Sequence, residues 1–442
     1  MKSILIKGGT LLTMDESNAI VSGDLLIRDS RIASVGESGQ TADVVIDAAG
    51  CAVLPGFVQT HIHLCQTIFR GAADDLPLLD WLKKRVWPME AAHDVASIKA
   101  SARLGVAELI KGGTTCALTM ETVNHTEEVF LVVEESGFRA TIGKCMMDKG
   151  DDVPAALHEN TDASIDESLA LFAAWHGKAD GRIRYCFAPR FALSCTSELL
   201  SRVGKLAREH GCIVHTHASE NRNECELVES ETGLRNVSYL DSLGLSGRHV
   251  VLAHCVHLDA AEFQMLANTR TNVAHCPSSN LKLGSGIAEI TRMLNQEISV
   301  SLGADGAACN NRLDMFTEMR TMGLLQKAMH GPEAISARQA LRIATIEGAK
   351  ALGLEKEIGS LEIGKRADVV VVKLDGLHST PSSSDPVSAL VYSAQTSDVQ
   401  NVVIDGQVVM RDRELLTLDE ESIVHDANRQ RSELMKRAGI DG

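Results

Sequence analysis

The stretch PGFVQTHIHLCQ, residues 55–66, places two histidines one residue apart at the end of an apolar run. A Pro-Gly pair precedes this run, which has the composition of a short buried strand. Side chains two positions apart on a β-strand point to the same side, so His61 and His63 present their imidazoles together. Two interpretations follow: a pair of surface residues on a strand, or the first two ligands of a metal ion.

The sequence that follows repeats this pattern of an apolar run and then a segment with helical spacing. The further runs are residues 114–120, 138–147, 183–191, 212–219, 249–255, 271–277 and 298–305. Between the third and fourth of these, Leu199, Leu200, Val203 and Leu206 recur at the spacing of an amphipathic helix. Together with residues 52–63, the runs make eight strand–helix units. This α/β alternation predicts a (β/α)8 TIM barrel over residues 56–359.

The two ends of the chain have a different texture, in which short β-rich runs alternate with Gly and Asp turns. We expect residues 1–55 and 360–415 to combine into one small β-sandwich domain. Residues 416–442 are expected to form a closing C-terminal helix, with its charges on a solvated face.

The composition restricts the possible partners. The formal net charge of the 442 residues is -16, which argues against nucleic acid because phosphate binding needs a basic surface. No run reaches the roughly 20 apolar residues that cross a bilayer, and the N-terminal residues lack the form of a signal peptide. The 11 cysteines include no C-x-x-C pair and are odd in number, which indicates reduced thiols and a cytoplasmic location.

Polar residues lie at the ends of several predicted strands, where barrel enzymes carry their catalytic groups. The fifth strand ends with His215 and His217, the sixth with His254 and the eighth with Asp305. Imidazoles and a carboxylate can hold a divalent metal while leaving a position open for water. Glu220 follows the fifth strand, where it could move protons to and from that water. These groups share one barrel mouth, which favours a metal-dependent hydrolase and leaves either His215 or His217 as the third imidazole.

Six motifs resemble the amidohydrolase superfamily, and in particular its branch of metal-dependent deaminases and chlorohydrolases. In chain order they read PGFVQTHIH, HTHASEN, LAHCVHLD, AHCPSSNLKLGSGIA, LGADGAACNNRLDMFTEMR and IGSLEIGKRADVVVV. The resemblance extends from about residue 5 to residue 410. It implies a barrel with a small flanking β domain, one divalent metal, with zinc expected and iron possible, and assembly into a homo-oligomer.

The resemblance also implies individual roles. The ligand set that it implies is His61, His63, His217 and Asp305. His217 takes this place rather than His215 because the acid follows it as H-x-x-E. Glu220 is then the proton shuttle, His254 contacts the hydrolytic water or the intermediate, and Asp305 helps to deprotonate that water.

The expected substrate is an aminopurine. Residues 70–91 and 303–320 resemble deaminases that act on adenosine derivatives altered at the 5′ position, in which the residue matching Glu90 contacts the ribose hydroxyls. This implies hydrolytic deamination by a metal-bound hydroxide. The expected substrates are 5′-deoxyadenosine, methylthioadenosine and S-adenosylhomocysteine, and the products are the inosine analogue and ammonia.

Two features point to other rings. APRFALSC, residues 188–195, and Gln66 in HIHLCQ resemble guanine deaminase, where the arginine holds the acceptor edge of the purine. The alternative is therefore an aminohydrolase of guanine or of a related pterin or s-triazine. A distant alternative is a metal-free barrel that serves as a scaffold, against which the complete ligand set argues. The expected substrate contacts are Gln66, Glu90, Arg190, Glu220 and His254.

Overall fold

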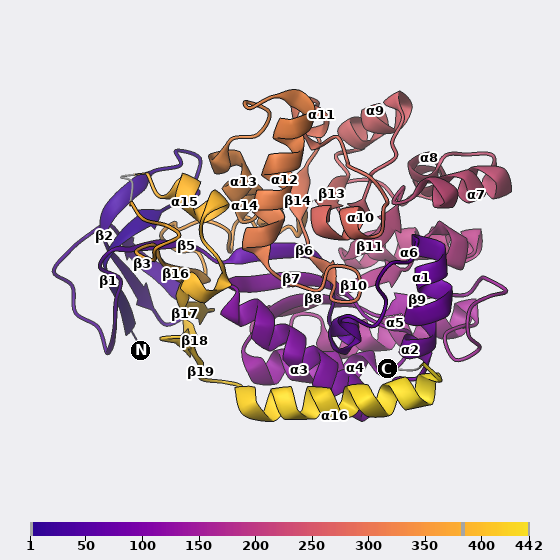
Figure 1. Ribbon diagram of the computed structural model, residues 1–442, viewed down its shortest axis with the longest axis horizontal. Helices are drawn as coiled ribbons and strands as arrows, with labels where there is room; N and C mark the ends of the chain where they lie inside the picture. The colour runs from indigo at the N-terminus through magenta and orange to yellow at the C-terminus, as the bar shows by residue number, and fades with distance from the viewer. Residues whose placement is uncertain (1–2, 382–384, 441–442) are drawn as a thin grey trace.

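The computed structural model describes residues 3–381 and 385–440. A parallel barrel sheet with surrounding helices occupies the middle of the chain, and a separate sheet made by the two chain ends lies at one end of the molecule (Figure 1). The predicted barrel with a small terminal β domain is therefore confirmed.

The barrel strands follow one another in sequence order and all neighbours are parallel. They are β6 (Phe57–His63), β7 (Thr114–Met120), β8 (Arg139–Gly143), β10 (Ile183–Pro189), β11 (Ile213–Ala218), β12 (Val250–His254), β13 (Asn272–His275) and β14 (Val300–Leu302). The short β9 (Cys145–Met146) extends the third strand and pairs with β10.

The eighth strand is broken into two pieces, and the break closes the barrel. Its first piece, β14, pairs with β13, and its second piece, β15 (Asp305–Gly306), pairs with β6. Between them, a Cβ on Gly303 would lie 2.6 Å from the carbonyl oxygen of His61, so only glycine allows this approach. The backbone then turns to φ +64 at Asp305, which places the carboxylate beside the end of β6.

Helices surround the barrel, and several begin with a side-chain N-cap. They are α3 (Val95–Lys111), α4 (Thr126–Ser136), α5 (Thr161–Trp175), α6 (Ser197–His210), α7 (Arg222–Thr232), α8 (Asn236–Ser242), α9 (Ala260–Thr269), α10 (Pro277–Lys282), α11 (Ile290–Asn295), α12 (Met315–His330), α13 (Ala337–Ile343) and α14 (Ile346–Ala351). In α6, for example, the Thr196 side chain accepts a hydrogen bond from the Leu199 backbone N–H.

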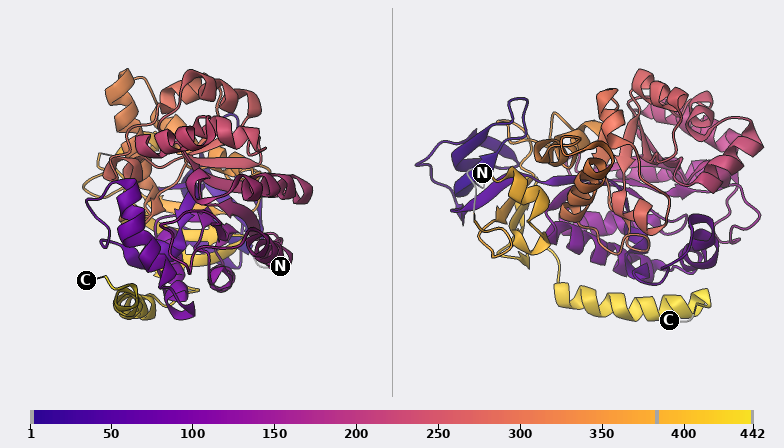
Figure 2. Two further views of the ribbon diagram at one scale, coloured as in Figure 1. Left: turned by 90° about the vertical axis from the view of Figure 1, so that its right-hand side faces the viewer. Right: turned by 45° about the horizontal axis from the view of Figure 1, so that its top comes forward.

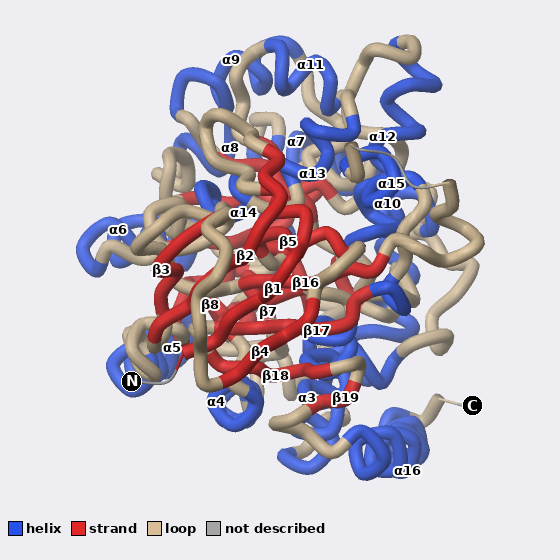
Figure 3. The backbone as a smooth tube through the Cα atoms, turned by 90° about the vertical axis from the view of Figure 1, so that its left-hand side faces the viewer, coloured by secondary structure: helices blue, strands red, loops and turns tan. Residues whose placement is uncertain are grey.

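The chain ends form one mostly antiparallel sheet of nine strands (Figure 3). These are β1 (Ser3–Leu12), β2 (Ile20–Arg28), β3 (Arg31–Val35), β4 (Val44–Asp47), β5 (Cys51–Pro55), β16 (Val369–Lys373), β17 (Val399–Ile404), β18 (Gln407–Arg411) and β19 (Glu414–Leu415). In β16 the side chains alternate: Val369 and Val371 join the core of this domain, while Val370 and Val372 pack on the barrel core. Burial on both faces fixes the sheet against the barrel.

Two helical regions lie outside this regular plan. Between β6 and α3 the chain forms the 3-10 helix η1 (Leu64–Phe69), α1 (Leu78–Trp81), the π-helix η2 (Leu82–Val86) and α2 (Trp87–Ala91). After β19, the long helix α16 (Glu420–Ala438) runs along the outside of the barrel and contacts α3, α2 and η1 (Figures 1 and 2). Short helices η3 (Ala192–Ser194), α15 (Val387–Tyr392) and η4 (Thr396–Asp398) complete the fold.

The cysteines and the apolar character of the helices bear on the environment of the protein. All 11 cysteines are buried and free. Within the described part of the chain, no helix combines the length and the apolar character that a membrane crossing requires.

Candidate active site

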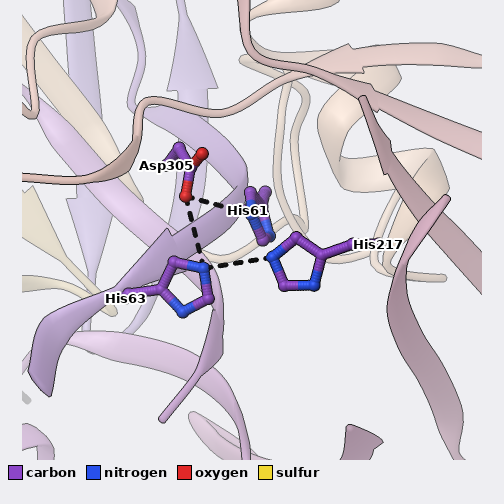
Figure 4. A group of neighbouring side chains, drawn as sticks. All are labelled: His61, His63, His217 and Asp305. Carbon is purple, nitrogen blue, oxygen red and sulfur yellow. Dashed lines mark hydrogen bonds and ion pairs between the residues drawn. The ribbon is translucent and has the colours of Figure 1, made fainter. Parts of the chain in front are cut away.

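Four side chains gather at the carboxyl ends of the barrel strands, and we call His61, His63, His217 and Asp305 the metal cradle (Figure 4). Their candidate ligand atoms all lie within 4.8 Å of one another. The Asp305 Oδ1 atom is 3.2 Å from Nε2 of His61 and 3.2 Å from Nε2 of His63. His217 completes the group from β11, with its Nε2 atom 3.3 Å from that of His63.

The other ring nitrogen of each of two histidines is held by a backbone carbonyl. Nδ1 of His63 lies 2.7 Å from the Met120 oxygen, and Nδ1 of His217 lies 2.7 Å from the Arg190 oxygen. A carbonyl only accepts, so each Nδ1 carries the hydrogen and each Nε2 presents a lone pair to the other. Two facing lone pairs repel unless a cation lies between them. The donor set and its orientation therefore fit a metal ion.

His61 is oriented by a second histidine. Its Nδ1 lies 2.7 Å from Nε2 of His215, and Nδ1 of His215 lies 3.0 Å from the Val251 oxygen. Because His215 must donate to that carbonyl, its Nε2 accepts the N–H of His61. This leaves the buried Nε2 of His61 without a hydrogen-bond partner and turned toward Asp305. The structure therefore places His217 in the cradle and His215 behind it.

The electrostatics give three of the four cradle residues the protonation states that metal binding needs. Burial lowers the pKa of His61 to about 4, and burial together with His61 holds the pKa of His217 well below its usual value. Burial acts to raise the pKa of Asp305, but His61, His63 and His254 together outweigh it, so the pKa lies well below 3.8 and the carboxylate is ionised. Burial lowers the pKa of His63, yet pairing with Asp305 produces a net rise, and a cation beside the same carboxylate would compete with that proton.

An acid–base pair borders the cradle. Nε2 of His254, at the end of β12, lies 3.6 Å from Glu220 Oε2 and 3.8 Å from Asp305 Oδ2. Burial, reinforced by Asp305, raises the pKa of Glu220 well above its usual value, which favours the protonated carboxyl. Its Oε1 atom is buried without a partner, and a protonated carboxyl there can donate to a substrate.

Two residues without an expected role, Ser279 and Asn280, orient Asp305 and His254. Ser279 donates its hydroxyl to Asp305 Oδ2 at 2.7 Å, and Nδ1 of His254 lies 2.8 Å from Asn280 Oδ1. Both residues lie on α10, directly after β13. Their signal in the sequence was a polar pair beyond the end of the seventh strand, inside the quoted motif AHCPSSN.

The remaining expected site residues form a buried cluster beside the cradle. We call residues 64–91, from η1 to α2, the substrate wall; Gln66 and Glu90 belong to it. Arg190 Nη1 donates to Glu90 Oε2 at 2.6 Å and its Nη2 donates to Oε1 at 3.3 Å, while Gln66 Nε2 donates to the same Oε1 at 2.8 Å. Glu90 is 1% exposed and both of its oxygens are engaged, so in this arrangement it does not face an open cavity.

The cavity between the cradle and the substrate wall is small, about 30 Å³. Its lining combines the cradle, Glu220 and His254 with Gln66, Arg190 and five apolar residues: Leu78, Trp81, Leu82, Phe191 and Leu283. This volume holds only one or two water molecules. A purine ring is larger than this cavity, so residues that line it must move to admit one.

Comparisons with known proteins agree with this geometry. Residues 52–409 match the family model described as the Amidohydrolase family. A 5'-deoxyadenosine deaminase of Methanobrevibacter smithii is 41% identical over 98% of this chain and 98% of its own. A 5-methylthioadenosine/S-adenosylhomocysteine deaminase of Pelotomaculum thermopropionicum is 40% identical over 99% of this chain and 100% of its own. Among solved structures, an adenosine deaminase of Xanthomonas campestris with bound zinc superimposes with a TM-score of 0.92 at 31% identity, covering 98% of this chain and 99% of that one.

Proposed function

Because this chain belongs to the amidohydrolase family, we propose that it removes the amino group of an adenosine-type nucleoside by hydrolysis. The observation that carries the proposal is the cradle with Glu220 and His254 at its rim, in a chain similar over its whole length to named deaminases of such nucleosides. The substrates are 5′-deoxyadenosine, methylthioadenosine or S-adenosylhomocysteine, and the products are the inosine analogue and ammonia.

Zinc is the metal we propose, with iron as the second choice. Three imidazoles and one carboxylate suit either ion and leave a position for water, and the Xanthomonas campestris structure is described with bound zinc. The residues that hold the ion are His61, His63, His217 and Asp305. When bound, such an ion supplies a water molecule whose pKa is lowered toward neutrality.

The protein groups around the substrate then handle the protons. Water oxygen adds to the ring carbon that carries the amino group, and Asp305 Oδ2 accepts a proton from that water. Glu220 donates its proton to the adjacent ring nitrogen, then takes up the remaining proton of the added hydroxyl and passes it to the departing amine. The proton on Asp305 returns to Glu220, which restores both carboxyl groups. His254 Nε2 lies against the added oxygen. The carbon–nitrogen bond breaks, a carbonyl forms at that carbon, and ammonia leaves.

A second candidate is a guanine-like ring, or a related pterin or s-triazine. It is favoured by Arg190 and Gln66, which both line the cavity, while Glu90 is engaged behind them. The unused N–H groups of Arg190 and the unpartnered Gln66 Oε1 offer a donor and an acceptor to a ring edge that carries an oxygen.

A panel of substrates tests the proposal. Zinc-loaded protein is incubated separately with 5′-deoxyadenosine, methylthioadenosine, S-adenosylhomocysteine, adenosine, guanine and melamine, and ammonia is measured by a coupled assay. Glu220→Gln is the blank, because it keeps the cradle and removes the proton. Ammonia from the adenosine compounds alone supports the first candidate, guanine or melamine alone supports the second, and no ammonia from any compound overturns both.

We also propose the domain division 1–55 and 360–415 for the β domain, 56–359 for the catalytic barrel and 416–442 for the closing helix. The helical part of that last segment supports its boundary. The cytoplasm is the proposed location, since the 11 buried free cysteines suit a reducing compartment. Assembly into a homo-oligomer is proposed as well, and sedimentation of the zinc-loaded protein tests it.

A further inference from the structure

Two arginines of α16 bond to the barrel, although the charges of this segment were expected to form a solvated face. Arg431 is half-buried, and its Nη1 donates to the Ile68 carbonyl oxygen at 3.1 Å and also to that of Arg70. Arg437 stays exposed, and its Nε donates to the Ala92 carbonyl oxygen at 2.9 Å. Its other nitrogens contact Asp94 and the Ser97 hydroxyl at the start of α3. The expectation therefore does not hold for Arg431, whose partners are backbone oxygens of the barrel.

These oxygens lie at the C-terminal ends of two helical parts of the substrate wall: η1, and the continuous helix over residues 78–91 that ends with α2. Ile68 lies in the last turn of η1 and Arg70 directly follows that helix, while Ala92 is the C-terminal cap of α2. The last carbonyls of a helix have no partner within it, and a basic side chain there also interacts favourably with the helix dipole. One outer helix thus caps both helical parts of the wall.

The capped helices are the ones that carry the polar residues of the wall. Gln66 lies on η1 and Glu90 on α2, and their 2.8 Å hydrogen bond joins the two helices on the cavity side. The arginines of α16 join the same helices on the outer side. η1 is only six residues long and has little stability of its own, while α1, η2 and α2 follow one another without a break over residues 78–91. The position of η1 against this longer helix therefore depends on such contacts.

Apolar packing also connects α16 with the substrate wall. Leu434 and Met435 of α16 belong to one buried cluster with Ile68, Phe69 and Trp87 of the wall. That cluster also contains the apolar residues of the wall that line the cavity: Leu78, Trp81 and Leu82. A continuous contact therefore leads from α16, on the outside of the barrel in both views of Figure 2, to the cavity.

We propose that Arg431 and Arg437 are positioning residues, which hold the substrate wall in the arrangement that receives the nucleoside. The inference rests on the proposed function for its substrate, although the contacts do not. The wall opens to admit a purine and closes over the bound nucleoside, and the two caps stabilise that closed complex. Loss of the caps weakens the closed complex, so substrate dissociates more readily and KM rises, while kcat stays close to its original value.

The test compares Arg431→Ala, Arg437→Ala and the double variant with Arg429→Ala. Arg429 lies on the same helix and, among residues 3–381 and 385–440, pairs only with Asp426 of that helix, so its removal is a matched loss of charge. Kinetics with 5′-deoxyadenosine, the zinc content and hydrogen–deuterium exchange of the whole zinc-loaded protein are measured. Arg431→Lys keeps a cation at the carbonyls and serves as the rescue variant.

We expect KM to rise about tenfold in the double variant, with kcat within about twofold and zinc content unchanged. Peptides covering residues 64–70 and 87–92 exchange faster, those of β11 do not, and Arg431→Lys recovers most of the change. The proposal is overturned if KM and the exchange rates match those of Arg429→Ala. It is also overturned if the variants lose zinc and their kcat falls with it. If the wild type deaminates nothing in the panel, the proposed function fails while exchange of the wall still decides this inference. The single variants carry the test if the double variant does not fold.

Discussion

The metal cradle and the substrate wall meet at one small cavity, but they are built in opposite ways. The cradle residues stand on strand ends of the barrel, and the register of the parallel sheet fixes their positions. The wall consists of η1 and a helix over residues 78–91, which are held by Arg190 directly after β10 and by side chains from α3 and α16. Chemistry is thus assigned to the rigid part and substrate choice to the part that has to move.

Metal removal has the largest expected effect and acts on the cradle alone. Chelation should abolish turnover and lower the melting temperature, since bound metal stabilises only the folded state. Hydrogen–deuterium exchange in the peptides that cover residues 64–70 and 87–92 should change little. Added zinc should restore activity, and recovery without any added metal would contradict the assignment of the cradle.

Glu90→Gln should destabilise the substrate wall and leave zinc binding by the cradle unchanged. The substitution leaves Arg190, whose side chain is 4% exposed, without its buried counter-charge. Removing one partner of such a pair costs about 3–5 kcal/mol of unfolding free energy. Urea unfolding measures this cost, and the zinc content should stay at that of the wild type. A double replacement by Met at positions 90 and 190 should recover most of the stability, because no buried charge remains.

His215→Phe should weaken the cradle without disturbing the wall. The His61 N–H loses its acceptor, and loss of such an orienting partner lowers metal affinity about 10–100-fold. Competition with a zinc-binding dye measures the affinity. His215→Gln can still accept that hydrogen bond, so its zinc affinity should lie between those of the wild type and His215→Phe. His249→Phe is the control for loss of a histidine outside the cradle. Equal affinity for all four proteins would exclude a role for His215.

Acid should destabilise the wall through His93, which bonds the Cys65 oxygen and the Ser97 hydroxyl. Burial lowers its pKa from 6.5 to about 3, so between these pH values the unfolded chain binds a proton that the folded chain does not. Stability therefore falls as pH drops from 6.5 toward 3. His93→Asn should flatten this slope by about 1.4 kcal/mol per pH unit in urea unfolding. The exposed His330→Asn serves as the control, and an unchanged slope in His93→Asn would mean that His93 is protonated in the folded state.

The same contrast explains what the sequence could predict. The apolar runs and the helical spacing located the barrel strands to within a few residues. Strand-end positions indicated His61, His63 and Asp305 but left His215 or His217 as the third imidazole, and the family resemblance selected His217, which the structure places in the cradle. The break at Gly303 was invisible, because it depends on how closely two backbones approach. Contacts of Glu90 with Arg190, and of Arg431 with η1, join positions far apart in the chain. No local pattern encodes such pairs.

The most direct test of the account traces the oxygen atom of water into the product. Zinc-loaded protein turns over 5′-deoxyadenosine in water labelled with oxygen-18, beside Glu220→Gln, and the purine product is analysed by mass spectrometry. Attack by water at the amino-bearing carbon predicts 5′-deoxyinosine with one labelled oxygen in the base, equimolar ammonia, and no product from the variant. An unlabelled product, a label in the ribose, or full activity of Glu220→Gln would contradict the roles of the cradle and of Glu220.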